Sequence, residues 1–159
     1  MDNKIIIIKP HHFLDIIKLH GAGLNVFVPD KKMGHDFYKI GNIILNNKNI
    51  LIKLTIENDD ICSPCKYCHN GKCIDNLTGI KGYTQKDTYN KTLDKRMIEL
   101  YNLDLNKEYT AYELCNIYLS NPEFIYKVWQ EEDDEKTDKR YELFKEGAKK
   151  YTLKKEINK

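Results

Sequence analysis

Four of the five cysteines in this chain fall within twelve residues. They are Cys62, Cys65, Cys68 and Cys73, in the segment Ile61-Cys-Ser-Pro-Cys-Lys-Tyr-Cys-His-Asn-Gly-Lys-Cys73. Gaps of two residues let a chain fold around a metal so that neighbouring sulfurs reach it at about 2.3 Å. Because core packing rarely produces such a density of thiols, the spacing predicts that these four cysteines form one metal-binding knuckle within residues 58–75.

The same spacing favours an iron-sulfur cluster over zinc. A zinc ribbon usually has two Cys-x-x-Cys hooks far apart in the sequence, whereas this chain has one compact hook. Cys-x-x-Cys-x-x-Cys is similar to the three contiguous ligands of bacterial ferredoxin clusters, although their fourth cysteine is more distant than Cys73 is here. We therefore expect an iron-sulfur cluster, most readily 4Fe-4S, with zinc as the alternative. A redox-active thiol pair or a disulfide is a further interpretation.

A second group of chemically capable residues lies near the N-terminus, where His11 and His12 follow Pro10. Adjacent residues on a helix point in different directions, so we expect one histidine to face the cysteines as a ligand, as a proton donor or as a hydrogen-bond partner of a ligand. The other would cap the helix or face solvent. A single capping or packed histidine explains the pair equally well. Asp60, two residues before Cys62, joins His11 and His12 as a catalytic candidate.

The elements that must position these residues follow from hydrophobic periodicity. Ile5–Ile8 predicts a buried strand, and the alternation from Ile50 to Ile56 predicts a second strand. Helical patterns start at His11 and end before Gly21-Ala-Gly23, and resume over residues 35–45, 86–100, 110–119, 122–129 and 136–151. Thr110-Ala-Tyr-Glu113 matches a capping box. Strand direction stays open at this stage.

These elements predict an α+β fold. A small sheet of at least two strands carries helices from the N-terminal part, a mainly helical C-terminal half covers residues 84–152, and the metal knuckle lies in a loop. The 159 residues are the usual size of one domain, so we expect a single domain over 1–159.

Cys115, on the predicted helix 110–119, is expected to be a small buried hydrophobic residue. The acidic run Glu131–Glu135 is expected to be a solvated helix junction.

The composition of the chain indicates which classes of binding partner and which compartment to expect. The formal net charge of +2 gives no sign of binding to nucleic acid, and the tyrosines at helical spacing are more typical of a core than of a base-stacking surface. The isoleucine run near the N-terminus is too short for a signal peptide or a membrane span. We therefore expect a cytoplasmic protein, in a compartment where clustered thiols stay reduced or bind metal.

Several motifs occur in a fixed order along the chain: Lys9-Pro-His-His-Phe-Leu14, Gly21-Ala-Gly23, Asp59-Asp-Ile-Cys-Ser-Pro-Cys65, Gly71-Lys-Cys73 and Tyr109-Thr-Ala-Tyr-Glu113. Together they resemble the DUF1284 family of small bacterial and archaeal proteins, and the resemblance spans roughly residues 4–120. It implies a probable iron-sulfur-binding protein. The family usually has a cysteine directly after its His-His-x-Leu stretch, where this chain has Asp15. Either Cys68 replaces that cysteine or Asp15 supplies an oxygen ligand, and both alternatives place the histidine motif near the knuckle.

Three functions remain open. The first is an iron-sulfur protein with a redox or electron-transfer role, acting with a redox partner or a small molecule. The second is an enzyme in which three cysteines hold a 4Fe-4S cluster with one iron open to substrate, as in a lyase or a sulfur-transfer enzyme. It predicts a pocket between the histidines and the knuckle, but a fourth thiolate would close the cluster. The third is a binding module stabilised by zinc.

Overall fold

A computed structural model describes residues 5–29, 34, 36–62, 64–65, 68–69, 72–73, 80 and 82–153, with only the backbone of His69, Lys72 and Cys73. The side chain of Cys73 therefore lies outside the described residues. The elements in chain order are β1 (Ile5–Ile8), α1 (Pro10–Gly21), α2 (Phe37–Asn46), β2 (Leu51–Leu54), β3 (Cys68–His69), β4 (Lys72–Cys73), α3 (Lys86–Tyr101), β5 (Glu108–Thr110), α4 (Ala111–Ser120), α5 (Phe124–Val128) and α6 (Asp134–Leu153).

The main sheet has three strands in the order β1-β2-β5. β1 and β2 are parallel, with Ile5 opposite Leu51, and the connection between them contains α1 and α2. β5 pairs with β2 in the antiparallel direction, with Thr110 opposite Leu51. The sheet settles the strand direction that the sequence left open, and it adds a third strand that the sequence analysis did not predict.

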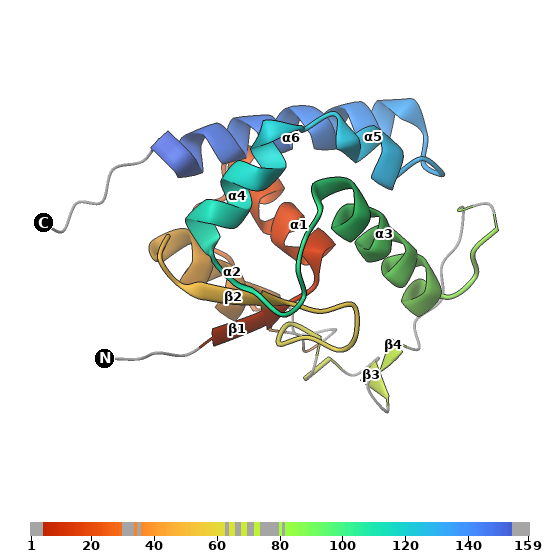
Figure 1. Ribbon diagram of the computed structural model, residues 1–159, viewed down its shortest axis with the longest axis horizontal. Helices are drawn as coiled ribbons and strands as arrows, with labels where there is room; N and C mark the ends of the chain where they lie inside the picture. Colours follow the sequence, from red (N-terminus) through yellow and green to blue (C-terminus); the bar gives the residue numbers. More distant parts are fainter. Residues whose placement is uncertain are drawn as a thin grey trace, which may run out of the picture.

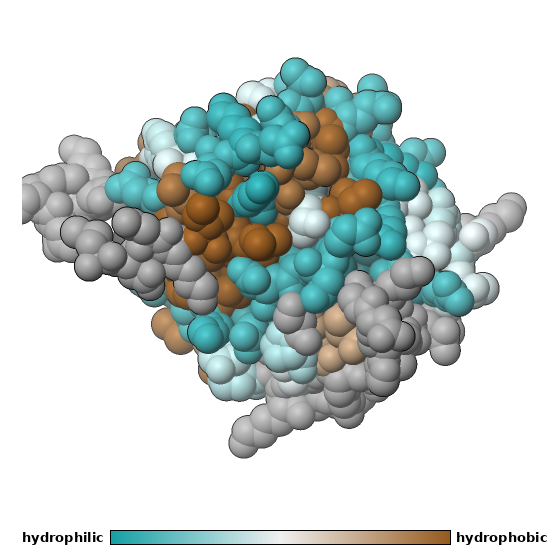
Figure 2. Space-filling model, turned by 60° about the horizontal axis from the view of Figure 1, so that its bottom comes forward, coloured by the Kyte–Doolittle hydropathy of each residue, from teal (hydrophilic) through white to brown (hydrophobic). Residues whose placement is uncertain are grey.

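The sheet buries one face. Ile6, Ile8, Ile52 and Leu54 are buried, whereas the alternate residue Ile7 is 41% exposed. The helices lie on the buried side, with α6 running across α1 and α4 at the top of the molecule and the sheet at the bottom (Figure 1). Figure 2 brings this bottom side forward and shows hydrophobic surface gathered among polar residues. The α+β architecture with a helical C-terminal half is therefore confirmed.

α1 is held in place at both ends. At its N-terminus the hydroxyl of Tyr118 donates to the carbonyl oxygen of Pro10 at 3.1 Å. At its C-terminus Gly21 packs against Gly147 of α6, where a Cβ on Gly147 would meet the carbonyl oxygen of Ile17. Glycine at both positions lets the two helix backbones approach closely, and this contact fixes the direction in which α1 presents its first turn.

Local sequence signals placed most helices within a few residues of their observed bounds. The capping box is present in the structure: Thr110 Oγ1 accepts from the Glu113 backbone N–H at 3.0 Å, and the Glu113 carboxylate accepts from the Thr110 N–H at 2.9 Å. Among the described helices, none is both long and apolar enough to cross a membrane.

One expectation was wrong in part, that of a solvated acidic run. Asp133, Asp134 and Glu135 are exposed, but Glu131 and Glu132 are not. Arg96 of α3 binds the Glu131 carboxylate through two nitrogens, at 2.6 and 2.7 Å, and Glu132 accepts from the Tyr89 hydroxyl at 2.9 Å. These contacts join α3 to the segment after α5, a tertiary arrangement that a run of like charges does not reveal.

The contact between α1 and α6 gives a first prediction. Gly147→Ala is expected to lower the free energy of unfolding by about 2 kcal/mol or more, because the added methyl group overlaps the α1 backbone. Thermal unfolding measures the change, with Glu146→Ala on the exposed side of the same helix as a control that should shift stability by less than about 0.5 kcal/mol. Equal effects of the two substitutions would contradict the close packing.

Candidate metal centre

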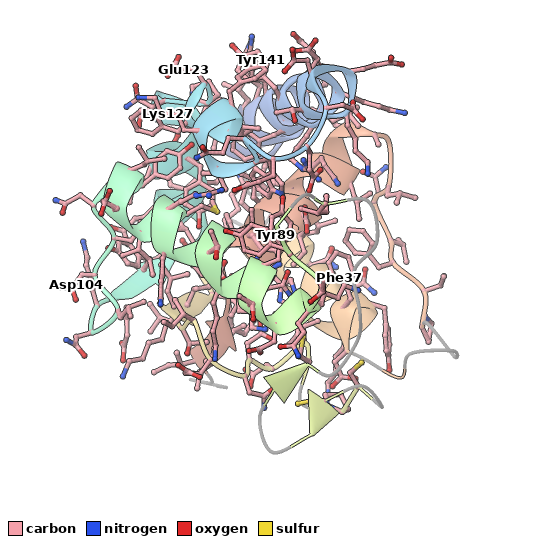
Figure 3. The ribbon with its side chains drawn as sticks, turned by 90° about the vertical axis from the view of Figure 1, so that its right-hand side faces the viewer. Phe37, Tyr89, Asp104, Glu123, Lys127 and Tyr141 are labelled. Carbon is pink, nitrogen blue, oxygen red and sulfur yellow. The ribbon has the colours of Figure 1, made fainter. Side chains whose placement is uncertain are left out.

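A cavity of about 350 Å³ lies between the first turn of α1, the cysteine segment and α3. Its polar side is lined by His11, His12, Asp15, Cys62 and Cys65. Its aromatic wall includes Phe37 of α2, Tyr89 of α3 and Trp129; the first two are labelled in Figure 3, where α3 lies in front. A pocket of the kind that the open-cluster enzyme hypothesis requires is therefore present, and Asp15 lines the same cavity as Cys62 and Cys65. Its role as a ligand stays a prediction.

Asp59 holds the cysteine segment against α1. Its Oδ2 accepts from the Lys9 backbone N–H at 2.8 Å and from His12 Nδ1 at 2.7 Å, and its Oδ1 accepts from the Cys62 N–H at 3.0 Å. The residue is 1% exposed. Burial opposes its ionisation, but the charge and hydrogen bond of His12 and the Lys9 N–H outweigh burial, so the pKa of Asp59 lies well below its usual range.

Asp94, on α3, binds both the backbone and the ring of His11. Its Oδ1 accepts from the His11 backbone N–H at 2.9 Å and from His11 Nδ1 at 2.8 Å. Asp94 is fully buried, and within the described part of the chain its Oδ2 has no hydrogen-bond partner. Burial lowers the pKa of His11, but the Asp94 carboxylate raises it by more, so the net shift is upward. Buried carboxylates thus accept from two backbone N–H groups at the start of α1, those of Lys9 and His11.

Both histidines line the cavity, which corrects the expectation that only one would face the cysteines. Their ring centroids lie 4.4 Å apart. Adjacent helix positions diverge at Cα, but each ring here is turned by its own carboxylate, Asp59 from the loop and Asp94 from α3. The local geometry of a helix could not predict this convergence, because neither carboxylate is close in sequence.

Asp60, the third catalytic candidate, lies at the edge of β1 and does not line the cavity. Its Oδ2 accepts from the Ile7 backbone N–H at 2.9 Å, and its own N–H donates to the Ile7 carbonyl oxygen at 2.9 Å. Asp60 therefore covers the edge of β1 that β2 leaves unpaired, and it is not among the residues that line the cavity. Its role in proton transfer stays a prediction. The carboxylates that contact the histidine rings are Asp59, at His12, and Asp94, at His11.

The structure brings Cys62 and Cys65, but not Cys68, to the cavity lining. The backbone turns twice here, with the Cys65 N–H donating to the Cys62 carbonyl at 2.9 Å and the Cys68 N–H to the Cys65 carbonyl at 3.0 Å. The Cys68 thiol donates to Asn58 Oδ1 at 3.2 Å, and its backbone pairs with Cys73 across a short hairpin. The ligand set of four cysteines stays a prediction.

Cys115 is fully buried on α4, as predicted, and burial raises the pKa of its thiol to about 12. Sequence reasoning gave no role to two residues that shape the cavity, Asp59 and Asp94. A signal for Asp94 existed, because it lies on the buried face of α3 that also contains Leu93 and Met97. A carboxylate on the apolar face of a helix requires a buried partner.

The gathered donor atoms fit a metal. Among the described residues, one donor atom each from His12, Asp59 and Cys62 lie within 4.8 Å of one another, and Cys62, Cys65 and Cys68 form no such group. Thiolate, imidazole and carboxylate ligands together suit zinc, and thiolates with imidazoles also hold two-iron clusters. The residues present therefore fit a metal, and the identity of that metal stays a prediction.

A family model matches residues 30–131, more than half of the 159-residue chain. The family is DUF1284, described as proteins of unknown function. The chain belongs to the DUF1284 family. The matched segment includes the cysteines, α3 and α4, and it begins after the His11-His12 turn. Comparisons with curated proteins and with solved structures found no match.

The buried Asp59 carboxylate gives a prediction about pH. The pKa of Asp59 is lower in the folded chain than the value near 3.8 of a free side chain, so its contribution to stability is complete above about pH 5 and falls as the pH drops below about 4. Asp59→Asn is expected to lose about 2 kcal/mol at pH 7, and to lose less additional stability than the parent chain between pH 5 and pH 3.

Urea unfolding at several pH values measures both quantities. The control is Asp104→Asn, which changes an exposed aspartate in the loop after α3 and should leave the pH profile of the parent chain unaltered. Parallel profiles for Asp59→Asn and the parent chain would show that the Asp59 carboxylate does not carry this charge interaction.

Proposed function

We propose that this protein binds an iron-sulfur cluster in the cavity beside Cys62 and Cys65, and that the cluster has a redox role in electron transfer. The observation that carries the proposal is the meeting of two thiols and two histidines in one cavity, contributed by segments about fifty residues apart. Spacing supports Cys68 and Cys73 as the other thiolate ligands of a 4Fe-4S cluster.

The surroundings of the two thiols support a redox centre. Cys65 is buried and Cys62 is half-buried, and an aromatic wall encloses the other side of the cavity. Burial and hydrogen bonds to the sulfurs set the reduction potential of a cluster. The cavity also has space for a small molecule, which supports the alternative use of the cluster in a lyase or a sulfur-transfer enzyme.

Anaerobic purification followed by absorption spectroscopy and iron, sulfide and zinc analysis tests this proposal. We expect a brown protein with several irons and sulfides per chain, a broad band near about 400 nm and reversible bleaching by dithionite. Protein that lacks iron and sulfide after anaerobic reconstitution with both would refute the cluster.

Cysteine substitutions then assign the ligands. Cys62→Ser and Cys65→Ser are expected to lose most of the iron and sulfide, because each removes a thiolate at the cavity. Cys68→Ser tests the prediction from spacing alone. The matched control is Cys115→Ala, which removes a buried thiol outside the cavity and should keep the metal content of the parent chain. Retention of a complete cluster by Cys62→Ser would contradict the proposed site.

Zinc is the second candidate, and the close grouping of donors from His12, Asp59 and Cys62 favours it. In that case the metal would clamp the cysteine segment to α1 and stabilise a binding module. The expected result is colourless protein with one zinc per chain, whose melting temperature falls when a chelator removes the metal. A melting temperature that the chelator leaves unchanged would exclude the structural role of zinc.

A further inference from the structure

We propose that His11 and His12 are ligands of the metal centre through their Nε2 atoms, and that Asp94 and Asp59 are the positioning residues that hold the two rings. This inference rests on the proposed function and assigns ligands to the same cavity. It replaces a ligand set of four thiolates with one of two thiolates, from Cys62 and Cys65, and two imidazoles.

The hydrogen bonds of the two rings fix which nitrogen is available. His11 Nδ1 donates to Asp94 at 2.8 Å and His12 Nδ1 donates to Asp59 at 2.7 Å. A carboxylate accepts only, so each Nδ1 keeps its proton and each Nε2 has a lone pair in the neutral ring. Histidines that bind metals characteristically donate their other ring N–H to a carboxylate or a carbonyl. The same arrangement occurs here at two consecutive residues.

The carboxylates of Asp59 and Asp94 are buried, where a charged group is unfavourable unless it is paired. Asp94 is fully buried and Asp59 is 1% exposed, and removing a carboxylate from water is unfavourable unless partners compensate for the lost hydration. Within the described residues, Oδ2 of Asp94 has no hydrogen-bond partner. A residue that only capped α1 would not need to orient an imidazole as well. The double hydrogen bond to His11 fixes both the backbone and the ring, as a metal ligand requires.

The four proposed ligands also line one cavity. Both rings, Cys62 and Cys65 line the same cavity, and the ring centroids are 4.4 Å apart. One ring nitrogen of His12, Nδ1 or Nε2, lies within 4.8 Å of the Cys62 sulfur. Cys68 is directed to Asn58 instead. Two thiolates with two imidazoles form the donor set of a two-iron, two-sulfide cluster in which histidines replace cysteines on one iron, and histidine ligation raises its reduction potential.

The test removes Nε2 without removing the donor to the carboxylate. In His11→Asn and His12→Asn, the asparagine amide N–H takes the place of Nδ1–H and can still donate to Asp94 or Asp59, but no second nitrogen reaches the cavity. The control is His20→Asn on the same helix, where the Nδ1 of a buried histidine donates to the Leu24 carbonyl at 3.2 Å, away from the cavity. Circular dichroism and thermal unfolding verify that each variant is folded.

Each variant is reconstituted anaerobically with iron and sulfide, and metal content, visible absorption and midpoint potential are measured. We expect His11→Asn and His12→Asn to bind the cluster at least about tenfold more weakly or to lose it, and His20→Asn to match the parent chain. His12→Cys should keep the cluster with a more negative midpoint potential, because a thiolate replaces an imidazole. This variant keeps the test decisive if an asparagine variant does not fold.

The outcomes separate the two proposals. If the parent chain binds a cluster and both asparagine variants keep its stoichiometry, absorption and potential, the histidines are not ligands, and the proposed function stands with cysteine ligands alone. If the parent chain binds no cluster, the proposed function fails first. In that case reconstitution of the same variants with zinc gives a separate result, and unchanged zinc affinity in both would overturn the histidine assignment for that metal too.

Discussion

The carboxylate of Asp59 joins the two parts of the chain that form the cavity. It is nearly inaccessible to water, and it accepts from the backbone N–H of Lys9 at the start of α1, from the His12 ring and from the backbone N–H of Cys62. Three donors compensate the cost of burying its charge. Because these donors belong to segments about fifty residues apart, one side chain fixes both the first turn of α1 and the start of the cysteine segment.

The remaining geometry depends on where α1 lies. Its C-terminal part is set by the contact of Gly21 with Gly147, which allows α6 to cross closely, and its first turn is set by Asp94 and by the Tyr118 hydroxyl. α3 has two functions in this arrangement, since Leu93 and Met97 pack in the core while Asp94 orients His11. The packing of the helical half therefore determines the position of the histidines, although none of its helices contains a cysteine at the cavity.

The chemistry available to the cavity follows from its mixture of donors. Thiolates favour zinc and iron-sulfur clusters, and imidazoles on buried carboxylates are held in one tautomer and one orientation. The aromatic wall and the volume of about 350 Å³ leave space beside a metal centre. The family model of DUF1284 matches residues 30–131, which contain the cysteine motifs but not the histidine motif. The description of that family assigns no activity, so the proposed redox role depends on the site itself.

The sequence by itself determined the features that depend on neighbouring residues. The strand Ile5–Ile8, a helix that ends at the Gly21-Ala-Gly23 segment, the capping box at Thr110 and the spacing of the cysteines all follow from local patterns. Tertiary structure alone decided that β5 pairs with β2, that Asp94 faces His11, that both histidines enter one cavity and that Asp60 covers the edge of β1. Each of these is a contact between segments distant in the chain, whose partner is fixed by the packing of the whole core and not by any local periodicity.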